Sequence, residues 1–490
     1  MRRLKLLLLL AAACAAAGPL AAQEPSPTLT LDDAIRLALQ RNKVLKVTSY
    51  LRGISRADLL AARGQFDPAL VLNRSFSQSQ FTSTLGPIPV ADNTKTDNYS
   101  VALQGVLPLG TQYTLTGSTL EVRDNYNGIS RNYQTFGGFQ VVQPLLKGFG
   151  LGANLVNVRV AKANRTISDL AYRQSAIDTV TEVILAYSNL QLAHDQLDAA
   201  RRARSVAVSF MEDNEKSFKI GSVSQSDVIT SRADAAQYEE SILLAERAVR
   251  DSQNQLRKLI GEDTFLEDEP LFTLAPMVVP DVTVDRRADL ERALNTRPDY
   301  RQQRLLIAKN RALESAAVNG VLPEVDFVGG YGYNGSSYSF TASRQMVQDH
   351  QNPSVSAGVT VTVPLTFAVG RGRMRAARLQ RAQSEEDLRR LEADIAVSVS
   401  NAAGQIETSR KRVAADEVAY SLAKQALEAE EKKKKAGTSS TLYVLQQQHS
   451  VVNTEINVSY ALASERQAVA NYDHELGTTL ERHQITLADE

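Results

Sequence analysis

The sequence predicts an α+β membrane protein in which a duplicated unit of helices and strands contributes strands to an oligomeric transmembrane β-barrel. Three observations predict this fold: an internal repeat, two very long helical segments, and short segments in which apolar and small polar residues alternate. Self-similarity at a fixed shift means that one structural unit occurs more than once in the chain. The helices and strands are then assigned within each copy.

Two blocks of the sequence align with later blocks without a gap. Leu29 to Leu72 matches Val284 to Phe327 at a shift of 255 residues, and a second block matches at a shift of 216. The chain is therefore expected to consist of a first repeat at 23–261, a linker at 262–284, a second repeat at 285–477 and a tail at 478–490. The second block pairs Lys219 with Lys435, Gly221 with Gly437, Val228 with Val444 and Gly261 with Gly477.

The first 22 residues have the pattern of a secretory signal peptide. Three basic residues precede an apolar run from Leu6 to Leu20, and small residues then lead to an expected cleavage site after Ala22. The only cysteine, Cys14, lies within this segment and raises the alternative of a lipidated protein, although the residues that follow it stay apolar. After cleavage the chain has no cysteine, which excludes disulfides and thiolate chemistry.

Composition and motif searches argue against an enzyme. Basic and acidic residues number 55 each and tryptophan is absent, so there is no general basic field for nucleic acid. The histidines are scattered without ligand spacing, and His194 falls on a helical seam where a partly buried structural role is expected. The glycine-bearing stretch from Lys147 to Gly152 lacks the lysine and hydroxyl residue of a phosphate loop, so it predicts a flexible corner. We expect no cofactor and no metal.

Helical periodicity predicts three helices in each repeat: a first helix, a long helix, and a helix that follows the turn. A first helix is expected at 31–63 and its copy at 285–318. Long helices are expected at 154–218 and 374–435, each about 90 to 100 Å long at 1.5 Å per residue. Their apolar residues recur at three- and four-residue spacing, which indicates coiled-coil seams. The seam of the first consists of Val180, Val183, Tyr187, Leu190 and Leu197, and that of the second of Ile395, Val399, Ala402, Ile406, Val413, Tyr420, Ala423 and Leu427.

Between the helices, apolar and small polar residues alternate with a period of two, as in membrane barrel strands. Four strands are expected in the first repeat, at 69–80, 99–107, 111–123 and 132–143, and two in the second, around 325–333 and 354–365. Because the shift falls from 255 residues at Pro68 and Pro323 to 220 at Pro144 and Pro364, the first repeat carries 35 additional residues, the size of one hairpin. Since about eight strands is the smallest observed barrel, six require an oligomer.

The segments between the strands are assigned to the two sides of the membrane. Polar connections are expected outside at 81–98 and 125–131, and a further polar connection joins the two later strands at 348–352. A tight turn at 107–110 is expected at the opposite rim.

The order of helix, strands, long helix, turn and helix, twice repeated, resembles the outer membrane efflux protein family typified by TolC. The residues that carry the resemblance are the sheet exits Gln143-Pro144-Leu145-Leu146 and Val363-Pro364-Leu365, the turns at Gly221 and Gly437, and the helix ends at Gly261 and Gly477. The resemblance implies a homotrimer in the outer membrane of a Gram-negative-type cell, with a strand pore and a helical tunnel across the periplasm. It also implies a periplasmic adaptor and an inner-membrane pump of RND, ABC or MFS type as partners.

The function implied is that of an exit duct of a tripartite efflux or type I secretion system. Two alternatives stay open: a dedicated polypeptide secretion duct, and a structural coiled-coil protein of the envelope. The exported substrate is not encoded in this chain, because in such systems the pump selects it.

The resemblance also directs attention to the helix-hairpin tips, where Gly221 and Gly437 mark the expected adaptor contact. Family members present acidic residues at the periplasmic gate, but here Tyr443 and Gln446 occupy those positions. Asp227 is retained in the first repeat, and Lys434 and Lys435 are basic residues of the facing turn. These residues suggest an ion-pair latch between adjacent hairpins; the alternative is that the charges are simply solvated. Four strands in the first repeat would also give a trimer 18 strands in place of the usual 12.

Overall fold

The computed structural model describes residues 28–85, 88–124, 131–262 and 272–487. The expected signal peptide and Cys14 lie outside these residues, as does most of the expected loop at 125–131. The chain forms two compact units. The helical unit comprises Met1–Lys46, Ser175–Thr296 and Ala396–Glu490, and the sheet unit comprises Val47–Gln174 and Arg297–Ile395.

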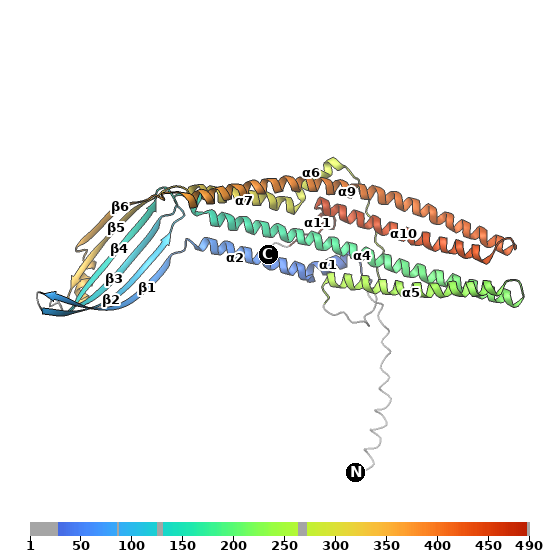
Figure 1. Ribbon diagram of the computed structural model, residues 1–490, viewed down its shortest axis with the longest axis horizontal. Coiled ribbons are helices and arrows are strands. Elements are labelled where there is room, and N and C mark those ends of the chain that lie inside the picture. Colours follow the sequence, from blue (N-terminus) through green and yellow to red (C-terminus); the bar gives the residue numbers. More distant parts are fainter. Residues whose placement is uncertain (1–27, 86–87, 125–130, 263–271, 488–490) are drawn as a thin grey trace, which may run out of the picture. The chain divides into compact units, whose positions relative to one another are not determined.

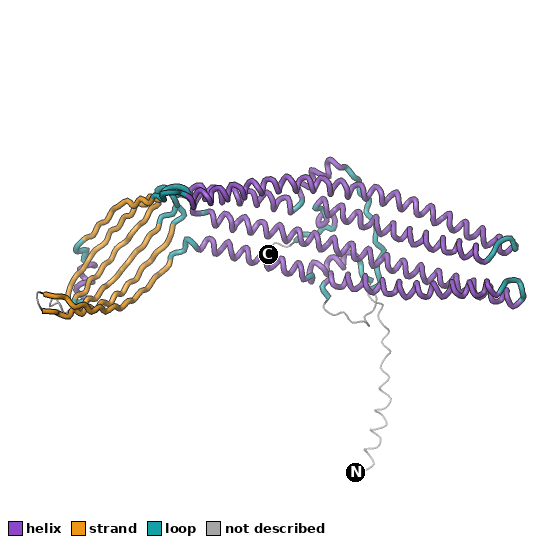
Figure 2. Tube along the Cα trace, in the orientation of Figure 1, coloured by secondary structure: helices purple, strands orange, loops and turns teal. Residues whose placement is uncertain are grey.

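The sheet unit contains one antiparallel sheet of six strands in chain order, so β1 and β6 are its edges (Figure 1). Four strands come from the first repeat and two from the second, which agrees with the number expected from the alternating pattern. The neighbouring strands lie side by side across the sheet (Figure 2). The strands are β1 (Ala69–Leu85), β2 (Ile88–Val106), β3 (Gln112–Asp124), β4 (Asn132–Pro144), β5 (Glu324–Ser337) and β6 (Pro353–Thr362).

Strand register divides the side chains of the sheet between two chemically different faces. Directly opposed residues of an antiparallel pair point to the same face, so each cross-strand row belongs to one face. One row is wholly apolar and exposed, and the adjacent row, on the other face, is mostly small and polar. The apolar row is Leu70, Leu103, Leu115, Phe139, Tyr331 and Val355, and the adjacent row is Ala69, Gln104, Thr114, Gln140, Gly330 and Ser356.

One connection within the first repeat differs from expectation and another agrees with it. The predicted long polar connection at 81–98 is instead mostly paired strand, because β1 and β2 continue to the pair Leu85 and Ile88. A hairpin extends for as long as its backbone groups pair, whatever the polarity of its side chains. The tight turn at 107–110 is present, with the Gly110 N–H donating to the Leu107 carbonyl over 2.8 Å.

The connection between β5 and β6 contains a helix that the sequence analysis misses, α8 (Phe340–Gln348). It packs on the apolar face, where the Ser343 and Thr135 hydroxyls are 2.8 Å apart and the Phe340 and Tyr133 rings are 6.1 Å apart. The signal was weak because nine residues give only about two and a half helical turns, too few for a clear period.

Each predicted first helix is divided in two. The first is α1 (Leu31–Arg41) followed by α2 (Lys43–Gly64), with the break at Asn42, whose Oδ1 accepts from the Val44 N–H over 2.8 Å. Its copy is α6 (Arg286–Thr296) followed by α7 (Pro298–Asn319). There the break falls at Arg297, because proline disfavours a helical conformation in the residue before it.

The long helices are α4 (Val156–Lys219) and α9 (Ala368–Lys435), so α9 begins six residues before the expected start at Met374. Each passes from the sheet unit into the helical unit, at Ser175 and Ala396 respectively. They are followed by α5 (Gln225–Ile260) and α10 (Thr441–Leu476), while α3 (Leu151–Asn154) and α11 (Thr479–Arg482) are single turns. Among the residues that the structure describes, no helix combines the length and apolar character that a membrane crossing needs.

The core of the helical unit follows the predicted seams. Val180, Val183, Tyr187 and Leu190 of α4 are completely buried, and Val399 and Ile406 of α9 nearly so. The Tyr187 hydroxyl donates to the carbonyls of Leu29 and Ala275, at 3.0 and 2.8 Å. The described end of the linker is thereby attached to α4. Further along the α9 seam, Ala402, Val413, Tyr420 and Leu427 are only partly buried, so that seam is looser.

Candidate functional site

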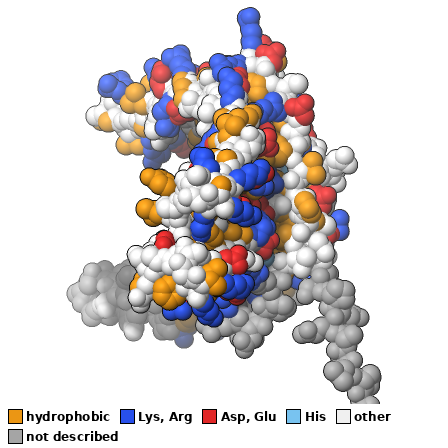
Figure 3. All heavy atoms as spheres, turned by 90° about the vertical axis from the view of Figure 1, so that its right-hand side faces the viewer, with side chains coloured by type: hydrophobic (Ala, Val, Ile, Leu, Met, Phe, Trp, Pro, Cys, Tyr) orange, Lys and Arg blue, Asp and Glu red, His pale blue; other side chains and the backbone are white. Residues whose placement is uncertain are grey.

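The candidate site lies at the turns of the two helical hairpins in the helical unit. The turn between α4 and α5 places Gly221 at φ 75°, and the turn between α9 and α10 places Gly437 at φ 78°. In each, the glycine N–H donates to a carbonyl three residues back and the next N–H to a carbonyl five residues back. Both turns therefore need the left-handed conformation, which glycine adopts at least cost. Figure 3 views the end where these turns lie and shows basic, acidic and hydrophobic side chains intermingled.

Asp227 is part of a helix cap. Its Oδ2 accepts from the Ser224 N–H at 3.1 Å and from the Ser224 hydroxyl at 2.6 Å, and its own N–H donates to the Ser224 Oγ at 3.2 Å. This reciprocal capping box satisfies two backbone donors at the start of α5. The hydrogen bonds from Ser224 are the main reason that the pKa of the Asp227 carboxyl lies below its usual value. Attraction to Lys434 is the smallest contribution.

Lys434 reaches α4 rather than Asp227. Its Nζ donates to the Asn214 Oδ1 at 3.1 Å and lies 3.7 Å from the centroid of the Phe210 ring. Burial lowers the pKa of the Lys434 ammonium, while Asp227 and Asp213 oppose this shift. The second hairpin is thus joined to the first by a cation held on an aromatic ring and an amide. A direct Asp227–Lys434 ion pair is not present in this conformation, because each group is already engaged elsewhere.

The other predicted gate residues are exposed. The Tyr443 side chain is 57 % exposed, and Lys435 and Gln446 also face solvent. Tyr443 occupies the third position of α10, as Asp227 does in α5, so it cannot complete a capping box with Ser440. Sequence reasoning missed Phe210, Asn214 and Ser224. The serine–aspartate spacing at 224 and 227 could have identified the cap, whereas the two α4 residues carried no signal.

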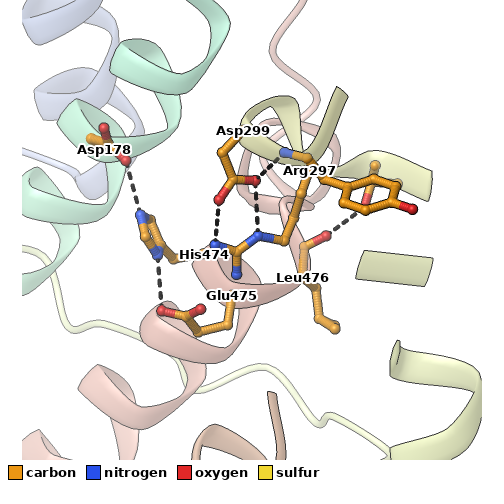
Figure 4. A network of polar contacts seen from close by, with 8 residues as sticks. Asp178, Arg297, Asp299, His474, Glu475 and Leu476 are labelled. Atoms are coloured by element: carbon orange, nitrogen blue, oxygen red, sulfur yellow. Dashed lines mark hydrogen bonds and ion pairs between the residues drawn. The ribbon is translucent and has the colours of Figure 1, made fainter. Parts of the chain in front are cut away.

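A second group of polar contacts joins the hairpins further along the helical unit (Figure 4). The His474 Nε2 of α10 lies 2.9 Å from the Asp178 Oδ1 of α4, and its Nδ1 lies 3.5 Å from the Glu475 Oε1. The hydrogen bond to Asp178 is the main cause that raises the pKa of His474 to about 9. At neutral pH the imidazolium therefore forms an ion pair between the two hairpins.

A third contact joins α5 to α10. The His449 Nε2 lies 2.7 Å from the Asp234 Oδ1, and its Nδ1 lies 3.2 Å from the Tyr238 hydroxyl. Burial is the main cause that raises the pKa of Asp234. The three side chains are the carboxylate, imidazole and hydroxyl types of a catalytic triad, but here they link two packed helices.

The remaining residues that the sequence analysis singled out, His194 and the corner at 147–152, make structural contacts. His194 is partly buried, as expected, and burial lowers the pKa of its imidazole. Among the described residues no group of histidine, cysteine, aspartate and glutamate could hold a metal ion. The corner at 147–152 is present, and in it the Gly148 N–H donates to the Asn319 Oδ1 at 2.8 Å and the Asn154 amide donates to the Gly148 carbonyl at 2.7 Å.

The comparisons with known proteins agree with this arrangement. The chain resembles the outer-membrane channel OprN with a TM-score of 0.70 at 15% identity, covering 91% of this chain and 89% of OprN. It resembles the Campylobacter jejuni CmeC outer membrane channel with a TM-score of 0.65 at 14% identity, covering 91% of this chain and 85% of CmeC. It also resembles the outer membrane protein VceC of Vibrio cholerae with a TM-score of 0.66 at 16% identity, covering 91% of this chain and 96% of VceC. No curated protein sequence matches significantly.

The duplicated helices and the two-faced sheet therefore define an outer-membrane channel protein. Residues 34–262 and 290–478 match the family described as Outer membrane efflux protein, one segment for each half of the duplication. The chain belongs to this family, and it is an outer-membrane efflux channel. The family is one of transport channels, not of enzymes.

Proposed function

We propose that this chain forms a homotrimeric duct that spans the outer membrane and extends into the periplasm, where it receives substrate from an inner-membrane pump through an adaptor. One observation carries the proposal: the register sorts the six strands into an exposed apolar face and a polar face. A sheet of this kind suits lipid on one side and water on the other.

The open edges of the sheet support oligomerisation. β1 and β6 are terminal strands, and in a bilayer their unpaired backbone groups would each cost several kcal/mol. Pairing β6 of one copy with β1 of the next removes both edges. Trimers of this family would then close a barrel of 18 strands in place of 12.

The hairpin turns are the proposed periplasmic end, with Gly221 and Gly437 at the adaptor contact. Asp227, Lys434, Lys435, Tyr443 and Gln446 are the proposed gate residues. The contacts of Lys434 with Phe210 and Asn214 support a closed state in which the second hairpin is held against α4. Tyr443 and Gln446 argue against an acidic, cation-selective ring.

The test is conductance of the purified full chain in planar bilayers, together with its mass in detergent. We expect a trimer that resists dissociation and a conductance that falls when residues 110–143, which contain β3 and β4, are removed. Unchanged conductance in the deletion variant would place that hairpin outside the barrel wall. A stable folded monomer without conductance would favour the structural envelope protein.

A deletion strain separates the two transport alternatives. Increased sensitivity to antibiotics supports an efflux duct that carries small molecules. Loss of one secreted protein with unchanged antibiotic sensitivity supports a dedicated polypeptide secretion duct of the type I class. The pump class, RND, ABC or MFS, follows from which adaptor and pump are retained with the channel after cross-linking.

A further inference from the structure

Basic residues are concentrated in the two segments that leave the sheet for the long helices. Residues 145–168, after β4, include Lys147, Arg159 and Lys162 and contain no acidic residue. Residues 363–383, after β6, contain five arginines and again no acidic residue. Helix stability does not explain this placement, because cations oppose the dipole at a helix N-terminus. We name Lys147, Arg159, Lys162, Arg371, Arg373 and Arg375 the basic collar.

Most collar cations have no counter-ion within the part of the chain that the structure describes. Lys147 pairs with Glu324, with 3.2 Å between Nζ and Oε2. Arg159, Lys162, Arg373 and Arg375 form no ion pair with any described residue, and the Arg371 guanidinium lies over the Phe367 ring at 6.0 Å. The side chains of Arg159, Arg371, Arg373 and Arg375 are all exposed. The collar therefore presents uncompensated positive charge.

Large apolar side chains are exposed beside these cations. Leu365 is 97 % exposed, Val369 68 % and Phe149 48 %. Water alone does not favour exposed apolar groups interleaved with cations, whereas the boundary between lipid headgroups and acyl chains favours both. Lysine and arginine can lay their aliphatic stems on apolar surface and extend their charges to phosphates.

A cavity in the sheet unit is lined by residues of these two segments together with the end of α7 and the turn that follows it. It has a volume of about 300 Å³ and is lined by Lys147, Arg373 and mainly apolar residues that include Val321, Phe367 and Val369. Phe367 has a φ of 54°, in the left-handed region that non-glycine residues rarely adopt. Such strain, which costs on the order of 1–3 kcal/mol, is concentrated at functional sites and ligand clamps.

We propose that the basic collar binds the phosphate groups of phospholipids in the periplasmic leaflet of the outer membrane. The proposal rests on the proposed function, which places the apolar face of the sheet in that membrane. Two features of this structure support it. The collar lies in the segments that follow β4 and β6, with Lys147 three residues after the end of β4 and Arg371 nine residues after the end of β6, and its charge complements anionic headgroups.

The test uses the purified full chain in detergent, mixed with equal amounts of phosphatidylglycerol and phosphatidylcholine and measured by native mass spectrometry. We expect phosphatidylglycerol to be retained at least about fivefold more than phosphatidylcholine, because each cation near an anionic surface favours it by roughly that factor. The triple variant Arg371→Gln, Arg373→Gln, Arg375→Gln should bring the ratio close to one. Arg373→Gln alone removes a single charge and should lower the ratio of retained phosphatidylglycerol to phosphatidylcholine by a smaller amount.

Two controls define the outcomes. Lys411→Gln changes an exposed lysine further along α9 and should keep the wild-type ratio. The charge-conserving triple variant Arg371→Lys, Arg373→Lys, Arg375→Lys should also keep the wild-type ratio. No preference in the wild type, or an unchanged ratio in the triple glutamine variant, overturns the proposal. If that variant instead dissociates into monomers with its ratio unchanged, the arginines serve contacts between copies.

Planar-bilayer conductance of the same samples tests the proposed function separately. Conductance without lipid preference would overturn only the role of the basic collar. Lipid preference without conductance would overturn the duct and leave the basic collar as a membrane-binding surface.

Discussion

The two helical hairpins share one turn but differ in how the helix after the turn begins. Gly221 and Gly437 have nearly the same φ, and the backbone hydrogen bonds around them correspond. After the turn, Ser224 and Asp227 form a capping box, whereas Ser440 makes no side-chain bond and Tyr443 replaces the aspartate. The two repeats therefore share the backbone conformation of the turn but differ in the side chains that begin the next helix. The helix after the turn is therefore better capped in the first hairpin than in the second. Lys434 and His474 both contribute contacts that join the second hairpin to the first.

The largest expected effect comes from separating the hairpins at His474. The pKa of His474 in the folded protein is about 9, above its ordinary value of 6.5. The ion pair with Asp178 therefore contributes its full stabilisation of the folded state below pH 6.5. That stability is lost as pH rises toward 9. His474→Gln should lower the free energy of unfolding by about 2 kcal/mol at pH 6, a discounted figure because Asp178 is partly exposed.

Thermal unfolding from pH 6 to 10 measures this effect. The wild type should lose stability relative to His474→Gln over that range. A constant difference between the two proteins would show that the histidine contributes packing and no charge. Asp178→Asn should reproduce most of the loss at pH 6.

The capping box tests the contrast between the hairpins directly. Ser224→Ala should destabilise the start of α5 by about 1 kcal/mol, because it leaves a backbone donor unsatisfied. Ser440→Ala at the equivalent position should change little, since its side chain makes no cap bond. Hydrogen exchange in the first turns of α5 and α10 measures both. Equal effects of the two substitutions would contradict the contrast.

Lys434 tests whether the contact with α4 holds the gate closed. Lys434→Gln removes the charge over Phe210, which is worth about 0.5 to 1 kcal/mol, so the open-to-closed ratio should rise roughly two- to fivefold. Lys411→Gln, an exposed lysine on the same helix but away from the turn, is the matched control. Single-channel recording measures the ratio. Asp227→Ala should also raise the open probability and admit large antibiotics such as vancomycin, but through loss of the cap as well as of charge.

The smallest effect is expected from making the second hairpin like the first. Tyr443→Asp restores the spacing of a capping box with Ser440 and should stabilise the start of α10 by about 0.5 kcal/mol. Through the negative ring that it creates, the substitution should also raise cation selectivity. Hydrogen exchange and reversal potentials in a salt gradient measure the two effects. If neither changes, position 443 lies away from the constriction and its side chain is simply solvated.

The sequence alone determined the duplication, the long helices, the six strands and the glycine turns. These features are local or periodic: glycine is required where φ is positive, and alternation follows from a strand's two faces. Tyr187, Leu190 and Val399 were found as core residues because a helical seam repeats at fixed spacing.

Tertiary structure decided how the predicted side chains are used. The sequence suggested a cation on another hairpin as the partner of Asp227, but in the structure its carboxylate accepts from Ser224, three residues away, and forms the helix cap. Lys434 meets Phe210 and Asn214, about 220 residues away, and His474 meets Asp178 across 296 residues. Contacts over such separations depend on helix packing and carry no pattern in one sequence. The strand extension to Leu85 and the helix α8 likewise arise from backbone pairing and packing rather than from local periodicity.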